Sequence, residues 1–154
     1  MRQLIPAEFA PEHLDIVGGR QDAAITSIVE RLKSELSVHQ YCEVGVDLAS
    51  EVLRQASFGW IDYFGGSKVS PGMILKSTAF AAFCAHGVVP ILSHREEIIA
   101  VDGDALPGPY FLREDSSRFP SHSELVTVRR RGSDWYREHA HSRQAARIYA
   151  EALS

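Results

Sequence analysis

The sequence predicts an α/β domain in which a mostly parallel sheet lies between two layers of helices. Strand and helix patterns alternate along the chain as far as Leu92, and alternation of this kind is typical of parallel sheets. The 154 residues fit one domain. We therefore expect residues 1–154 to form a single unit, with residues 1–12 as an N-terminal extension.

The first half of the alternation begins with a strand from His13 that ends in the glycine pair Gly18 and Gly19. The helix that follows has one apolar face with the helical period of 3.6 residues, made of Ile25, Ile28, Val29, Leu32 and Leu36. We expect a second strand over 38–44, then a helix over 48–55 whose N-cap is Asp47.

The second half continues with a strand over 58–63, a loop over 65–72 and an alanine-rich helix over 77–86 that Gly87 ends. The continuous apolar run 88–92 predicts a buried parallel strand. Further along, the sequence favours short strands at 98–101 and 110–112, a loop over 114–123 and amphipathic helices over 133–153. Together these elements predict a Rossmann-like, three-layer α/β/α domain.

Composition excludes several classes of function. The formal net charge of −4 argues against a polyanion partner such as nucleic acid. Cys42 and Cys84 lie in apolar runs without metal-ligand spacing, which predicts buried thiols in a reducing compartment. No signal-peptide pattern appears, and the apolar run 79–92 is shorter than the ~20 residues that span a bilayer. We expect a cytoplasmic protein without a metal site, since no histidine cluster has zinc spacing.

An anion site is predicted where the glycine-bearing loop meets the helix that begins near Ser77 and Thr78. Helix N-termini offer free N–H groups to anions, and Lys68 and Lys76 add positive charge. No acidic residue occurs between Asp62 and Glu96. The plainer alternative is an ordinary cap and an ordinary loop.

Other candidate residues are weaker. The turn Gly18, Gly19 and Arg20 also follows a strand, but it lacks the three spaced glycines of a dinucleotide-binding fingerprint. Tyr63 is a candidate pocket wall, although aromatic residues at a strand end more often pack in the core. The basic run 129–131 is most simply a solvated turn, with at most a peripheral contact to membrane phosphates.

The order of these segments resembles the C-terminal domain of GT-B glycosyltransferases, the retaining family-4 group. The resemblance rests on residues 14–19, 41–46 and 50–61, on the helix and turn at 76–91, and on the closing helix at 142–153. It covers roughly residues 12–153. The motifs are weak one by one, and their shared order carries the resemblance.

The resemblance implies a donor site for a nucleoside-diphosphate sugar such as UDP- or GDP-hexose. Gly18 and Gly19 would line the pocket floor with Arg20, and Ser77 and Thr78 would meet the diphosphate. A second set would lie near the base and contact it largely through backbone: Glu43, Val44 and Gly45. No further cofactor and no metal is implied, because cations and a helix dipole neutralise the leaving group.

The resemblance also implies an enzyme that is incomplete here. Such enzymes react in a cleft between two domains, and the other domain holds the acceptor. We therefore expect a fragment or subunit that transfers a hexose only with an acceptor-binding N-terminal domain or partner, and we name no catalytic residue.

The rival interpretation is a non-enzymatic Rossmann-like interaction or regulatory module with a vestigial pocket. The family carries two glutamates eight residues apart, and Ile74 and Ala82 stand at those positions here.

Overall fold

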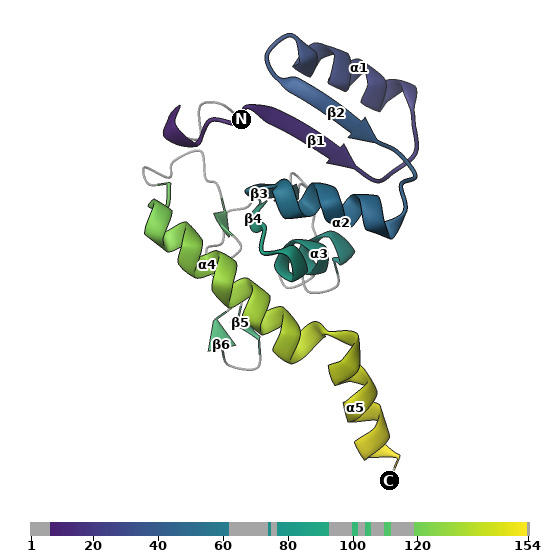
Figure 1. Cartoon of the computed structure of the whole chain (residues 1–154), viewed down its shortest axis with the longest axis vertical. Helices are drawn as coiled ribbons and strands as arrows, with labels where there is room; N and C mark the ends of the chain where they lie inside the picture. The colour runs from purple at the N-terminus through teal and green to yellow at the C-terminus, as the bar shows by residue number, and fades with distance from the viewer. Residues whose placement is uncertain are drawn as a thin grey trace. The chain divides into compact units, whose positions relative to one another are not determined.

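The structure is a computed structural model, and it describes residues 7–61, 74, 77–92, 100–101, 104–105, 110–111 and 119–153. The chain divides into two compact units, which we call unit 1 (Met1–Gln55) and unit 2 (Ala56–Ser154). Helices mixed with short parallel strands confirm the α/β class (Figure 1). The single domain over 1–154 stays a prediction.

Unit 1 is built around two parallel strands joined by a helix. Its elements are η1 (Ala7–Phe9), β1 (His13–Val17), α1 (Ala23–Lys33), β2 (Ser37–Tyr41) and α2 (Val46–Gln55). The pairing runs from His13 opposite Ser37 to Val17 opposite Tyr41. The second strand was expected to reach residue 44 and ends at Tyr41 instead. Glu43 has φ of 51°, a left-handed conformation that a strand does not accommodate.

The helices of unit 1 begin differently from each other. Asp22 caps α1, since its Oδ1 accepts hydrogen bonds from the N–H of Ala24 at 2.7 Å and of Ile25 at 3.0 Å. The prediction that Asp47 caps α2 is wrong, because α2 begins one residue earlier, at Val46. Asp47 thus lies in the first turn of α2, where its negative charge interacts favourably with the helix dipole and still stabilises the helix.

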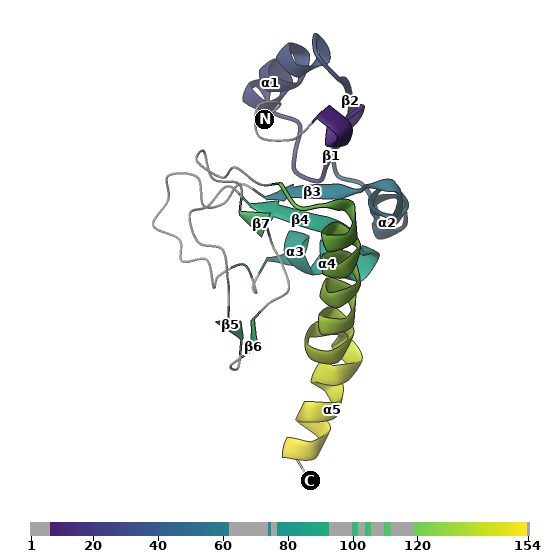
Figure 2. The same ribbon diagram turned by 90° about the vertical axis from the view of Figure 1, so that its left-hand side faces the viewer.

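Unit 2 contains a three-stranded parallel sheet in the order β3–β4–β7 and a separate antiparallel pair, β5–β6. Its elements are β3 (Phe58–Ile61), α3 (Thr78–His86), β4 (Val89–Leu92), β5 (Ala100–Val101), β6 (Asp104–Ala105), β7 (Tyr110–Phe111), α4 (His122–Trp135), the π-helical η3 (Tyr136–Ala140) and α5 (Ser142–Ala152). The sequence did not predict β6. Within this unit α3 lies on one face of the sheet and α4 packs against α3 (Figure 2).

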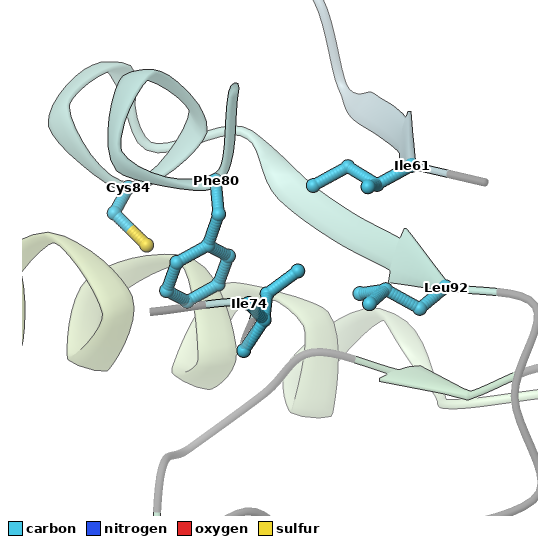
Figure 3. Packing of buried hydrophobic residues seen from close by; sticks show 5 residues of the cluster. All are labelled: Ile61, Ile74, Phe80, Cys84 and Leu92. Carbon is cyan, nitrogen blue, oxygen red and sulfur yellow. The ribbon is translucent and has the colours of Figure 1, made fainter. Parts of the chain in front are cut away.

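The core of unit 2 forms where α3 meets the sheet. The central strand β4 is buried at all four positions, as expected for a parallel strand with both neighbours in place. Side chains from α3 and from two strands point toward one another there (Figure 3), and the cluster consists of Ile61, Ile74, Phe80, Cys84 and Leu92.

The C-terminal helices start earlier than the sequence analysis placed them. Residues 114–123 were expected to be loop and 133 the start of the first helix, whereas α4 begins at His122. A capping box sets this start: Ser121 Oγ accepts from Glu124 N–H, and the Glu124 carboxylate accepts from Ser121 N–H. The spacing Ser121-x-x-Glu124 is visible in the sequence and is the local signal for this helix start.

Cys84 is a free thiol buried in the core, as predicted, whereas Cys42 is only half-buried. Burial raises the pKa of the Cys84 thiol from 9.0 to about 12, because the thiolate would lose its hydration there.

This burial predicts that Cys84 is unreactive in the folded protein. In a Cys42→Ser variant, we expect a thiol reagent at pH 8 to modify Cys84 only on unfolding, so that its rate rises by orders of magnitude in urea. Because the folded pKa is the higher one, the stabilisation from the neutral thiol is complete below pH 9. It is lost as the pH rises from about 9 to about 12. Rapid modification without denaturant would contradict the buried position.

Candidate functional site

In unit 1 the structure brings together two groups of residues that the sequence analysis selected. Gly18 and Gly19 directly follow β1, and Glu43 follows β2. Gly18 N–H donates to Tyr41 O at 2.9 Å, and Glu43 N–H donates to Gly19 O at 3.3 Å. Because β1 and β2 are parallel, these segments meet at the carboxyl ends of the strands, where ligands of open α/β sheets bind.

The glycine pair is needed for its backbone conformation. Gly18 has φ of 91° and Gly19 has φ of 75°, values that other residues adopt only with strain. No heavy atom of the described residues lies within 4 Å of a Cβ added at either position, apart from the adjacent residues of the chain. The described part of the chain therefore leaves space beside the turn.

The charged side chains of this turn are exposed. Arg20 Nε lies 3.9 Å from Glu43 Oε1, and the two side chains are 91% and 74% exposed. An ion pair this open and this long contributes little to stability. Both side chains are therefore available to a ligand at small cost.

Val44 and Gly45, the other two residues expected near the nucleotide base, contribute to the local structure. Val44 is half-buried, and Gly45 precedes α2, where its carbonyl accepts the first helical hydrogen bond, from Ala49 N–H at 3.1 Å. At α1, the helix N-terminus is already occupied by the Asp22 carboxylate. A phosphate at that N-terminus would meet a negative charge instead of free N–H groups.

In unit 2 the predicted helix N-terminus exists, with its two residues in different roles. Ser77 is 9% exposed and caps α3, since its Oγ accepts from Phe80 N–H at 3.2 Å. Thr78 is exposed and is the first residue of the helix. The N–H groups of Thr78 and Ala79 have no acceptor within a helix that begins here, so an anion would meet Thr78 rather than the Ser77 hydroxyl.

Three predicted site residues, Tyr63, Lys68 and Lys76, lie outside the described residues. The structure does place Ile74, which stands where the resemblance implies a glutamate. Its side chain is fully buried in the core. That position therefore contributes packing, not a carboxylate, to unit 2.

A polar cluster that was not predicted from the sequence lies on the two strands of unit 1. Asp15 lies between two histidines: His39 Nδ1 is 3.2 Å from Oδ1, and His13 Nε2 is 3.4 Å from Oδ2. Residues two apart in a strand lie on the same face of the sheet, so His13 and Asp15 share a face. His39 lies opposite Asp15 in the neighbouring strand. The spacing His13-x-Asp15, with a histidine in the next strand, is therefore the signal in the sequence. The hydrogen bond between His39 and Asp15 links β2 to β1, and His13 lies within ion-pair distance of the same carboxylate.

Other features of the described part of the chain set limits on the site. Among those residues no group of three His, Cys, Asp or Glu side chains is placed to hold a metal ion. An open depression of about 300 Å³ runs along α4, and none of the predicted site residues lines it. Its lining is Ser123, Glu124, Thr127, Val128 and Arg131.

One further limit concerns membranes. Where the chain is described, no helix combines the length and the apolar character needed to cross a bilayer.

Comparisons with family models, with curated proteins and with solved structures find no match to this chain. The function is therefore inferred from the residues themselves.

Proposed function

We propose that this chain binds a nucleoside-diphosphate sugar and is the donor half of a retaining, GT-B-like hexosyltransferase with a Rossmann-like, three-layer domain. It acts in the cytoplasm and transfers the hexose only with an acceptor-binding domain or subunit. The proposal needs no metal and no further cofactor. Its donor-site residues are Gly18, Gly19, Arg20, Glu43, Val44, Gly45, Tyr63, Lys68, Lys76, Ser77 and Thr78.

The observation that carries the proposal is the exposed start of α3. This helix connects two parallel strands, β3 and β4, so it begins at the edge where β3 ends. Thr78 is exposed at that edge, and helix N-terminal N–H groups together with the dipole favour a phosphate. In the sequence, the segment leading into α3 carries lysines and no acidic residue, which adds to the same preference.

The proposal is tested by replacing Thr78 with glutamate. We expect UDP, GDP or ADP to stabilise the wild-type protein, and we expect the Thr78→Glu affinity for the same diphosphate to fall at least about tenfold through charge repulsion. The variant should remain folded, because an acidic residue in the first turn stabilises a helix. Calorimetric titration gives the affinities, and thermal unfolding without ligand gives the stability.

The matched control is Thr78→Gln, which has nearly the same size and no charge. It should keep most of the affinity. If Thr78→Glu binds as tightly as Thr78→Gln, the diphosphate does not lie at α3. If the wild-type protein responds to no diphosphate at millimolar concentration, the whole proposal is wrong.

The rival interpretation, an interaction module with a vestigial pocket, is favoured by one specific observation. Helix α5 continues past the end of α4 in both views (Figures 1 and 2) and exposes the large apolar side chains of Ile148 and Tyr149, at 54% and 71%. Leu153, at its C-cap, is 88% exposed. An 11-residue helix with an uncovered apolar stripe gains little from its own packing. Self-association or co-purifying protein, without any nucleotide response, would support this rival.

A further inference from the structure

We propose that His141 is a pH-sensitive cap that controls the order of helix α5. The neutral imidazole holds the N-terminus of the helix, and protonation of the ring in mildly acidic solution releases it. The device lies in unit 2 and is independent of the proposed nucleotide site. It acts on the helix that carries the exposed apolar side chains of Ile148 and Tyr149.

A histidine ring caps the N-terminus of α5. His141 has an extended backbone, with φ of −68° and ψ of 139°, and its Nδ1 accepts a hydrogen bond from Arg143 N–H at 3.2 Å. Its carbonyl oxygen accepts from Gln144 N–H at 2.9 Å. A ring nitrogen accepts a hydrogen bond only while it carries no proton, and both nitrogens of an imidazolium are donors. The cap therefore exists only while His141 is neutral.

Protonation of His141 weakens α5 in two ways. It removes the acceptor for Arg143 N–H, and it places a positive charge at the positive end of the helix dipole. Loss of an N-cap typically shifts a helix–coil equilibrium about fivefold. An isolated helix of 11 residues is marginal in water, so α5 depends on its cap. Histidine changes charge between about pH 5 and pH 8, which sets the range in which the helix responds.

Other titratable and charged groups surround the joint between α4 and α5, where η3 packs against α3, α4 and α5. They are Cys84 and His86 of α3, Asp134 in the last turn of α4, Tyr136, Arg137, Glu138 and His139 of η3, and Arg143, Arg147 and Glu151 of α5. The Tyr136 ring lies against His141, with the ring centroids 6.1 Å apart. Glu138 precedes His141 by three residues, and its attraction for an imidazolium would oppose the release of the helix.

His139, the other histidine of this joint, responds to a proton in the opposite sense. Its Nδ1 lies 3.2 Å from Trp135 O, and its ring stacks on the Trp135 ring at 5.8 Å and 14°. A carbonyl oxygen needs an N–H donor, which an imidazolium retains. A positive charge near the last carbonyls of α4 is also favourable. His139 is therefore the matched control for His141.

Amide hydrogen exchange of the full chain, followed by NMR at about pH 7.5 and about pH 5.5, tests the proposal. Protection factors are compared, because they correct for the intrinsic pH dependence of exchange. We expect the protection of α5 to fall at least about fivefold at the lower pH, since the uncapped state binds the additional proton. Helix α3 is the internal reference, because the Ser77 hydroxyl that caps it does not titrate. Its protection should change less than about twofold.

Three variants identify the group that responds. His141→Asn supplies a cap that stays neutral, so the protection of α5 should differ by less than about twofold between the two pH values. His139→Gln should keep the wild-type fall, and Glu138→Gln should keep or enlarge it.

Each contrary outcome overturns the role of His141. A wild-type α5 that is equally protected at both pH values shows no pH-sensitive cap, and an α5 without protection at about pH 7.5 shows no cap at all. A His141→Asn variant with the wild-type fall shows that the proton acts elsewhere. Loss of the fall in His139→Gln assigns the response to His139 instead.

Discussion

Replacement of Phe80 by alanine should lower the free energy of unfolding of unit 2 by about 3–5 kcal/mol. Phe80 is 2% exposed and belongs to the cluster in Figure 3. Its ring centroid is 5.9 Å from that of Trp135, so the side chain joins α3 to α4. The truncation would remove the transfer free energy of the ring and leave a cavity that helices packed on a sheet cannot close.

Urea denaturation followed by tryptophan fluorescence measures this loss. The matched control is Val126→Ala on α4, because Val126 is apolar but 54% exposed. It should change the free energy of unfolding by less than about 0.5 kcal/mol. If Phe80→Ala costs no more than Val126→Ala, the core does not pack as described.

The second large effect is expected at Gly59, on strand β3. This residue is buried, and a Cβ added to it would overlap the ring of Phe83 on α3. Gly59→Ala must therefore push α3 away from the sheet or force the Phe83 ring out of its rotamer. Either change should lower the free energy of unfolding by about 1–3 kcal/mol. Urea denaturation measures this loss.

Two further variants make the cause at Gly59 identifiable. Phe83→Leu places a smaller side chain at the contact. The double variant Gly59→Ala with Phe83→Leu should therefore lose less free energy of unfolding than the two single variants lose in sum. Gly132→Ala, on helix α4, is the matched control. Among the described residues its added Cβ would contact Cys84 Sγ of α3, at 3.7 Å, which is an ordinary van der Waals distance. There alanine should stabilise the protein by about 0.5–1 kcal/mol. A full additive loss in the double variant would contradict the contact between Gly59 and Phe83.

Part of the candidate site was predictable because its signals are local. The Ser77 cap and the Gly87 end of α3 each follow from residues within one or two turns of the helix, and both are confirmed. The glycine pair after β1 was also found from the sequence. The sequence analysis also expected Ser77 to contact the diphosphate. A sequence shows that a serine can cap a helix, but it does not show that the residue becomes buried when it does so, as Ser77 does.

The sequence by itself determined the alternation of elements, the parallel pairing and the two ends of α3, because periodicity and capping act over a few neighbouring residues. Only the tertiary structure decided which distant residues meet. Glu43 lies against the glycine turn, Asp15 lies between two histidines, and Gly59 faces the Phe83 ring. Such contacts depend on strand register, helix packing and backbone angles at positions far apart in the chain, and a local pattern shows at most one side of each contact.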